Sequence, residues 1–104
     1  MKLNEYKRIR LFYPRPKPRF KNDCFEVTFL PNINNNYRFG KMFMYFNDCF
    51  GDENDINFIE FKEKCEKISV LIEDNNLSQL IDFIIENGFL AKSIDVVNDG
   101  LHIY

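Results

Sequence analysis

The segment from Leu77 to Asn87 carries the clearest secondary-structure signal in the chain. Its apolar residues fall on one face of a helix, at Leu77, Leu80, Ile81, Ile84 and Ile85. Asn76 can cap the first turn, and Gly88 suits the left-handed residue that ends a helix. A helix with one apolar face must bury it against another element, so the rest of the chain has to supply a covering layer.

Strand patterns surround this helix in the sequence. Apolar and polar residues alternate, or apolar residues run together, over residues 6–13, 24–30 and 38–46. The last of these is apolar on both faces, which predicts a central strand covered by a helix. Residues 93–97 and 101–104 predict a hairpin, because the Asp-Gly pair between them favours a tight turn.

Residues 57–67 fit two structures, a helix or an alternating strand. Apolar residues spaced by three and four, from Phe58 to Ile72, favour the helix, which we expect to be followed by a strand over residues 67–73. Together the elements predict an α+β domain. We expect an antiparallel sheet of four to six strands with one or two helices packed on one face.

Length and cysteine content limit the class of protein. With 104 residues, the chain is expected to form a single domain over 1–104. Cys24, Cys49 and Cys65 are odd in number and lack the close spacing of metal or redox sites, so we expect three free thiols and a cytoplasmic location. We find no secretory signal and no apolar run of membrane-spanning length, so no membrane partner is expected.

The charge of the chain is unevenly distributed. Residues 1–21 hold eight basic residues and one acidic residue, whereas residues 22–104 hold six basic and fifteen acidic residues. The chain therefore has a basic, proline-containing N-terminal strand or arm and an acidic body. Such asymmetry favours electrostatic recognition, either of another molecule or of the body by its own arm.

The basic arm allows three interpretations. Arg15, Lys17 and Arg19 alternate with prolines, and with nearby aromatic residues they could bind nucleic acid through phosphate contacts and stacking. The prolines could instead form a polyproline ligand for an aromatic groove. The arm could also be an edge strand whose charges and prolines prevent aggregation, which needs no partner.

Catalytic and cofactor motifs are missing from the sequence. The four glycines are scattered, so no phosphate-binding loop is predicted. His102 is the only histidine and alternates with Leu101 and Ile103, so we expect an ordinary histidine facing solvent from a terminal strand. We therefore expect no enzyme activity, no cofactor and no metal.

An acidic cluster is the candidate binding site. Its residues are Asp48, Asp52, Glu53 and Asp55 in one loop, extended by Glu60 and Glu63. The position of Gly51 ahead of most of these acids does not fit a calcium loop. Carboxylates spaced in this way can imitate a phosphate backbone and so occupy a basic groove.

These features predict a small non-enzymatic inhibitor that binds a basic protein such as a toxin or nuclease. An immunity protein of a bacterial toxin system is the first version of this hypothesis. The second is a phage-encoded inhibitor of a defence nuclease, of anti-CRISPR type. The alternatives from other classes are a nucleic-acid-binding module that uses the basic arm and a small RNase toxin that acts without histidine. The sequence does not predict the oligomeric state.

Overall fold

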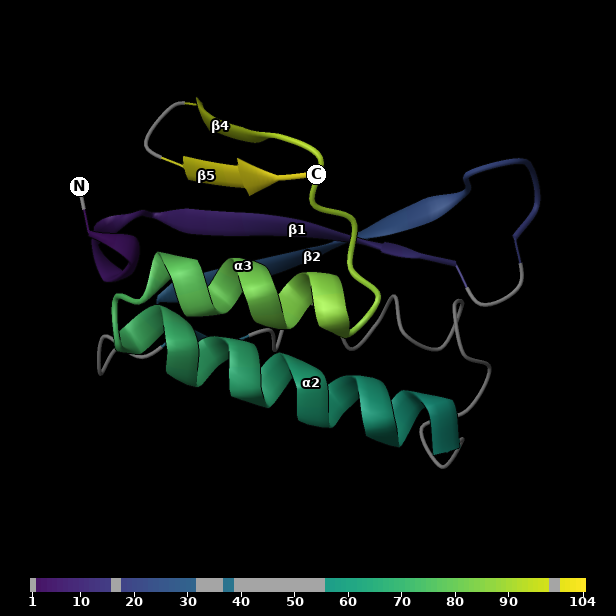
Figure 1. Cartoon of the computed structure of the whole chain (residues 1–104), viewed down its shortest axis with the longest axis horizontal. Coiled ribbons are helices and arrows are strands. Elements are labelled where there is room, and N and C mark those ends of the chain that lie inside the picture. Colours follow the sequence, from purple (N-terminus) through teal and green to yellow (C-terminus); the bar gives the residue numbers. More distant parts are fainter. Residues whose placement is uncertain (1, 16–17, 32–36, 39–55, 98–99) are drawn as a thin grey trace.

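The computed structural model describes residues 2–15, 18–31, 37–38, 56–97 and 100–104 (Figure 1). Its elements, in chain order, are the 3-10 turn η1 (Leu3–Glu5), β1 (Arg8–Pro14), β2 (Cys24–Pro31), β3 (Tyr37–Arg38), α2 (Ile56–Glu73), α3 (Leu77–Glu86), β4 (Ile94–Val97) and β5 (Gly100–Ile103). The prediction of an α+β arrangement is confirmed.

The described strands form one sheet in the order β3-β2-β1-β5-β4. β1 is antiparallel to β2 but parallel to β5, so the sheet is mixed and the prediction of a purely antiparallel sheet is wrong. The β4–β5 hairpin follows the helices in the chain, and its second strand lies on the side of β1 that β2 leaves open. β1 is consequently a central strand, so the interpretation of the basic segment as a sheet edge is wrong for its residues in β1.

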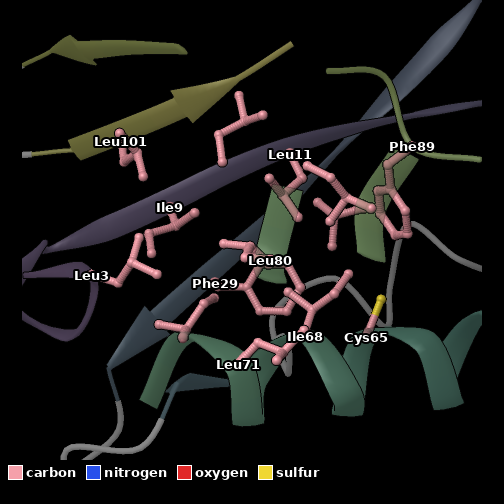
Figure 2. Close-up of a cluster of buried hydrophobic side chains, with 14 of the residues drawn as sticks. Leu3, Ile9, Leu11, Phe29, Cys65, Ile68, Leu71, Leu80, Phe89 and Leu101 are labelled. Atoms are coloured by element: carbon pink, nitrogen blue, oxygen red, sulfur yellow. The ribbon is translucent and has the colours of Figure 1, made fainter. Parts of the chain in front are cut away.

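The hydrophobic core lies between the sheet and the two helices (Figures 1 and 2). Alternate residues of β1 and β2, among them Leu11 and Phe29, have no exposed surface, as the alternating pattern predicts. The core cluster also takes in residues of the helices and β5, including Phe61, Cys65, Ile68, Ile72, Leu80, Ile84, Leu101 and Ile103. No described helix covers the opposite face of the sheet, which we call the uncovered face.

α2 is one continuous helix of 18 residues, so the predicted strand over residues 67–73 is wrong. The helical spacing that begins at Phe58 continues through Ile68 to Ile72, and all three side chains are buried. Val70, which the strand pattern grouped with Ile68 and Ile72, is 47% exposed on the other side of the helix. The three-and-four spacing therefore outweighs the short alternating pattern inside it.

The predicted ends of α3 are confirmed. The side chain of Asn76 accepts a hydrogen bond from the backbone N–H of Gln79, and Gly88 has a φ of 88°. Leu80 and Ile84 are fully buried, Ile81 is half-buried, and the flanking Leu77 and Ile85 are exposed. The apolar face is thus narrower than its sequence pattern suggests.

The hairpin predicted near the C-terminal end of the sequence is confirmed in β4 and β5, which pair antiparallel. Of the predicted strand over residues 38–46, only Arg38 lies within the described residues, where Tyr37 and Arg38 form β3 beside β2. Among the helices that the structure describes, none has the combination of length and hydropathy needed to cross a bilayer.

Candidate functional site

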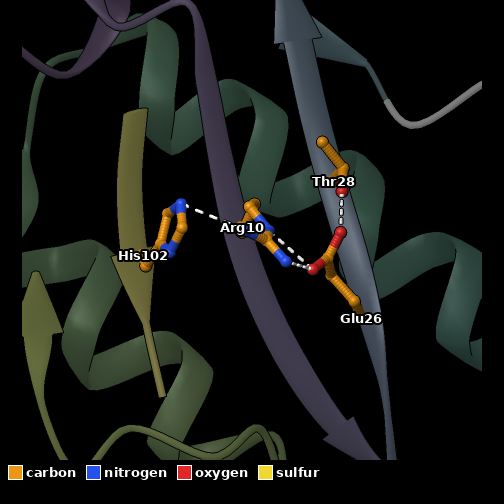
Figure 3. A network of polar contacts seen from close by, with 4 residues as sticks. All are labelled: Arg10, Glu26, Thr28 and His102. Carbon is orange, nitrogen blue, oxygen red and sulfur yellow. Dashed lines mark hydrogen bonds and ion pairs between the residues drawn. The ribbon is translucent and has the colours of Figure 1, made fainter. Parts of the chain in front are cut away.

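A polar network lies on the uncovered face and joins the three central strands (Figure 3). Arg10 of β1 donates from Nε to Glu26 Oε1 at 2.6 Å and also from Nη2 to the same oxygen. Thr28 Oγ1 donates to the other oxygen, Oε2, at 2.7 Å. Burial alone would raise the pKa of Glu26, but the hydrogen bonds from Arg10 and Thr28 outweigh it and hold that pKa below its usual value. The Glu26 carboxylate thus links β1 to β2 through its hydrogen bonds with Arg10.

His102 of β5 completes this network. The prediction that His102 faces solvent is wrong. Only 9% of its surface is exposed, because it sits beside Arg10 on the neighbouring strand. Arg10 Nη1 lies 3.4 Å from His102 Nε2, and since a guanidinium can only donate, Nε2 accepts and the ring is neutral. Burial and then the charges of Arg10 and Arg8 lower the pKa of His102.

This pKa shift predicts a pH-dependent stability. Because the folded-state pKa of His102 lies below its ordinary value of 6.5, the unfolded chain binds the proton more readily, and stability falls as pH drops below about 6.5. We expect the free energy of unfolding to fall less between pH 7 and pH 5 in His102→Gln than in the wild type. Urea melts at both pH values measure this. Equal losses in the two proteins would contradict the assignment of a neutral, buried His102.

The basic segment after β1 folds back onto Asp23. The backbone N–H of Arg19 donates to Asp23 Oδ2 at 3.0 Å, and this bond contributes most to lowering the pKa of the carboxyl group. Arg15 Nε lies 3.1 Å and Arg19 Nε 3.4 Å from the same oxygen. Two of the three predicted basic-patch residues are therefore ion-paired within the chain, and the third, Lys17, lies outside the described residues.

A pocket of about 470 Å³ opens beside the polar network. Phe12 and Tyr104 form its aromatic wall, with ring centroids 5.5 Å apart and nearly perpendicular planes. The residues that line it are Phe12, Pro14, Asn22, Asp23, Cys24, Leu90, Lys92 and Tyr104. The sequence does not indicate this pocket, because the residues that line it come from segments far apart in the chain.

The position of Cys24 in this pocket predicts selective thiol chemistry. Cys24 is partly exposed, whereas Cys65 is fully buried in the core and burial raises the pKa of its thiol. We expect iodoacetamide to modify Cys24 in the folded protein and to leave Cys65 unmodified until denaturant is added. Peptide mass spectrometry locates the label, and Cys24→Ser is the control. Rapid labelling of Cys65 without denaturant would contradict the described core.

The outer face of α2 has an unusual composition. Ile59, Glu63, Glu66 and Val70 are spaced by four, three and four residues, which places them on one side of the helix, and all four are exposed. Ile59 is 41% and Val70 47% exposed. We call these four residues, together with the adjacent exposed Glu60, the α2 outer face.

Two of the predicted binding residues, Glu60 and Glu63, thus belong to the α2 outer face. Glu66 and the two apolar residues were missed, although their helical spacing was a usable signal once α2 was taken as continuous. The pairs Glu60–Lys64 and Glu63–Lys67 have favourable spacing, but Lys64 Nζ instead donates to the backbone oxygen of Asn87 at 3.2 Å. No salt bridge joins the three glutamates of this face to another residue in the described part of the chain.

The acidic loop residues Asp48, Asp52, Glu53 and Asp55 lie outside the described residues. In the sequence they directly precede α2. Within the described ranges, no group of three or more His, Cys, Asp or Glu side chains is arranged to hold a metal ion. Comparisons with protein-family models, curated protein sequences and solved structures find no match to this chain.

Proposed function

We propose that this chain is a small non-enzymatic protein-binding domain that inhibits a basic protein, such as a toxin or nuclease, through the α2 outer face. The observation that carries this proposal is the exposure of Ile59 and Val70 on the same side of α2 as Glu63 and Glu66. Such a face offers both apolar contact area and charge complementarity, and stable protein interfaces combine the two.

The dimensions of the face suit a binding surface. Ile59 and Val70 are eleven residues apart, which is about 16 Å along a helix axis. The two glutamates lie between them, so a partner that buries both apolar side chains also covers both carboxylates. Burying unpaired carboxylates is costly, so this arrangement selects a partner that presents lysine or arginine at the matching positions.

The distribution of charge among the described residues supports a basic partner. Residues 56–87, which contain both helices, hold seven carboxylates and three lysines. On the sheet side, Arg10 is paired with Glu26, and Arg15 and Arg19 are paired with Asp23. The helical layer therefore carries an excess of negative charge, which steers basic proteins towards it.

The immunity-protein and phage-inhibitor hypotheses share this chemistry, because each requires an acidic surface that covers a basic groove. They differ in the partner, which is a toxin in one case and a defence nuclease in the other. We place the immunity protein first, and the identity of the captured partner distinguishes the two.

Nucleic-acid binding is the alternative function. Phe12, Tyr104 and Arg8 lie on the uncovered face, where stacking and phosphate contacts could occur. The internal ion pairs of Arg10, Arg15 and Arg19 weigh against it, since these charges already have carboxylate partners. A module of this kind would show binding to polynucleotide that weakens steeply with salt.

The experiment compares three immobilised baits. They are the wild type, a double variant that carries both Glu63→Lys and Glu66→Lys, and the control variant Arg8→Gln. We expect the wild type and the control to retain the same basic protein from a host extract, and the charge-reversed bait to lose it. Retention of that protein by all three baits would refute binding through the α2 outer face. If the wild type captures nucleic acid and the Arg8→Gln bait loses that binding, the result would instead support the alternative function.

A further inference from the structure

The edge strand β4 is short but lacks the lysine and proline that commonly protect a sheet edge. All four of its residues are exposed, and three of them are apolar: Ile94 at 46%, Val96 at 63% and Val97 at 40%. Natural edge strands are commonly protected by lysine, proline, bulges or a covering helix, and the sequence Ile-Asp-Val-Val contains neither lysine nor proline. Figure 1 shows β4 at the outer margin of the sheet.

Part of the apolar surface of β4 lies on the helical side of the sheet. In the β4–β5 register, Ile94 lies opposite Ile103 and Val96 opposite Leu101, so both share the face of the sheet that the helices cover. Two helices about 10 Å wide cover about four strands spaced 4.8 Å apart, which leaves the fifth strand bare. α2 contacts β3 at the far side of the sheet, so the bare strand is β4.

α3 also exposes apolar side chains. Leu77, Ile81 and Ile85 are spaced by four residues and form a stripe along the helix. Leu77 is 41% and Ile85 55% exposed. Exposed apolar residues therefore occur on both β4 and α3.

We infer that β4 pairs with β4 of a second copy of this chain in an antiparallel arrangement, which joins the two sheets of five described strands into one continuous sheet. Residues opposite each other in a sheet must point to the same face, so a two-fold pairing is centred on a residue, and only Asp95 or Val96 as the centre lets more than one residue of β4 pair. Centring on Asp95 places two carboxylates side by side, which is unfavourable. Centring on Val96 pairs Val96 with its own copy and Asp95 with Val97 of the other.

The same residues disfavour the basic partner as occupant of this edge. Asp95 is the only charged residue of β4, and its carboxylate accepts a hydrogen bond from the Tyr104 hydroxyl group on the uncovered face. Because the one carboxylate of this edge already accepts a hydrogen bond, a basic strand would find no other acidic side chain on β4 with which to form an ion pair. A second copy brings equal numbers of apolar side chains to both sides, so the edge is complementary to itself.

The test is the oligomeric state of the full chain, measured by sedimentation over a range of concentrations. We expect a wild-type dimer, and we expect Val96→Lys to remain folded by circular dichroism but to sediment as a monomer. Ile59→Lys, a matched substitution on the α2 outer face, should remain a dimer. A wild type that stays monomeric, or a dimer that Val96→Lys leaves intact, would overturn the inference.

A cross-link tests the register independently of any effect on folding. Val96→Cys should form an intermolecular disulfide under mild oxidation, because the two copies of residue 96 are opposite each other. Ile94→Cys should not, since the two copies of residue 94 lie on opposite sides of the centre of the pairing and are four residues apart along the strands. Cross-linking of Ile94→Cys but not Val96→Cys would overturn the inferred pairing. Because β4 and the α2 outer face are separate surfaces, failure here leaves the proposed inhibitory function untouched.

Discussion

Replacing Ile84 with alanine is expected to lower the free energy of unfolding by about 2 to 5 kcal/mol. Ile84 has no exposed surface and lies in the core cluster between α3 and the sheet. Removing its three outer carbons leaves a cavity that the packed neighbours cannot fill. Since small domains unfold with about 5 to 15 kcal/mol in total, this single change threatens the fold.

Ile81→Ala is the matched control for this prediction. Ile81 is on the same helix but only half-buried at the margin of the core, so we expect a smaller loss than for Ile84→Ala. Chemical denaturation of both variants gives the comparison. Equal losses would show that the two positions are equally buried, contrary to the described packing.

Reversing the charges of Glu63 and Glu66 to lysine is expected to have the largest effect on function. Both carboxylates are exposed on α2, so the change should alter stability little. Electrostatic steering accelerates association by about 10- to 1,000-fold, and we expect a loss within this range at low salt. Stopped-flow association with the captured partner measures the rate, and the difference from the wild type should shrink as salt rises.

The acidic loop provides a second comparison with the same partner. Changing Asp48, Asp52, Glu53 and Asp55 to Asn or Gln should also slow association and leave folding nearly intact, if the loop extends the α2 outer face. If both the loop variant and the α2 variant associate with the partner as fast as the wild type, there is no reason to call the protein an acidic inhibitor.

Elements stabilised by local interactions were predictable from the sequence. The Asn76 cap and Gly88 are signals within a few residues of the helix ends, and both occur where the sequence indicates. The alternation in β2 likewise predicted its buried side, because the sheet has one helical face. Local chemistry determines these features, and a single sequence contains that chemistry.

The wrong predictions about His102 and β1 concern contacts between distant segments. Nothing near Arg10 in the sequence indicates that His102 lies beside it, since that contact depends on β5 pairing parallel to β1. The burial of His102 and the central position of β1 follow from the same pairing. The strand predicted over 67–73 failed for a different reason, because a short alternating pattern was contained in a longer helical one.

The candidate site was predictable in part. Glu60 and Glu63 were predicted from charge alone, and the structure places both as exposed residues on the α2 outer face. Ile59 and Val70 were missed because apolar residues in an amphipathic pattern are ordinarily assigned to the core. Their exposure depends on which side of α2 the sheet occupies, and that becomes known only when the layers are assembled.

The pairing of β1 with β5 also determines how the domain can assemble during synthesis. Residues 8–11 are synthesised before residues 100–103, with which they pair, so one side of the central strand stays open while some ninety further residues are made. An open strand edge invites pairing with other chains, and charged side chains discourage it. Arg8 and Arg10 lie on this strand. We therefore expect the basic residues of this strand to discourage such pairing in the nascent chain until β5 closes the sheet.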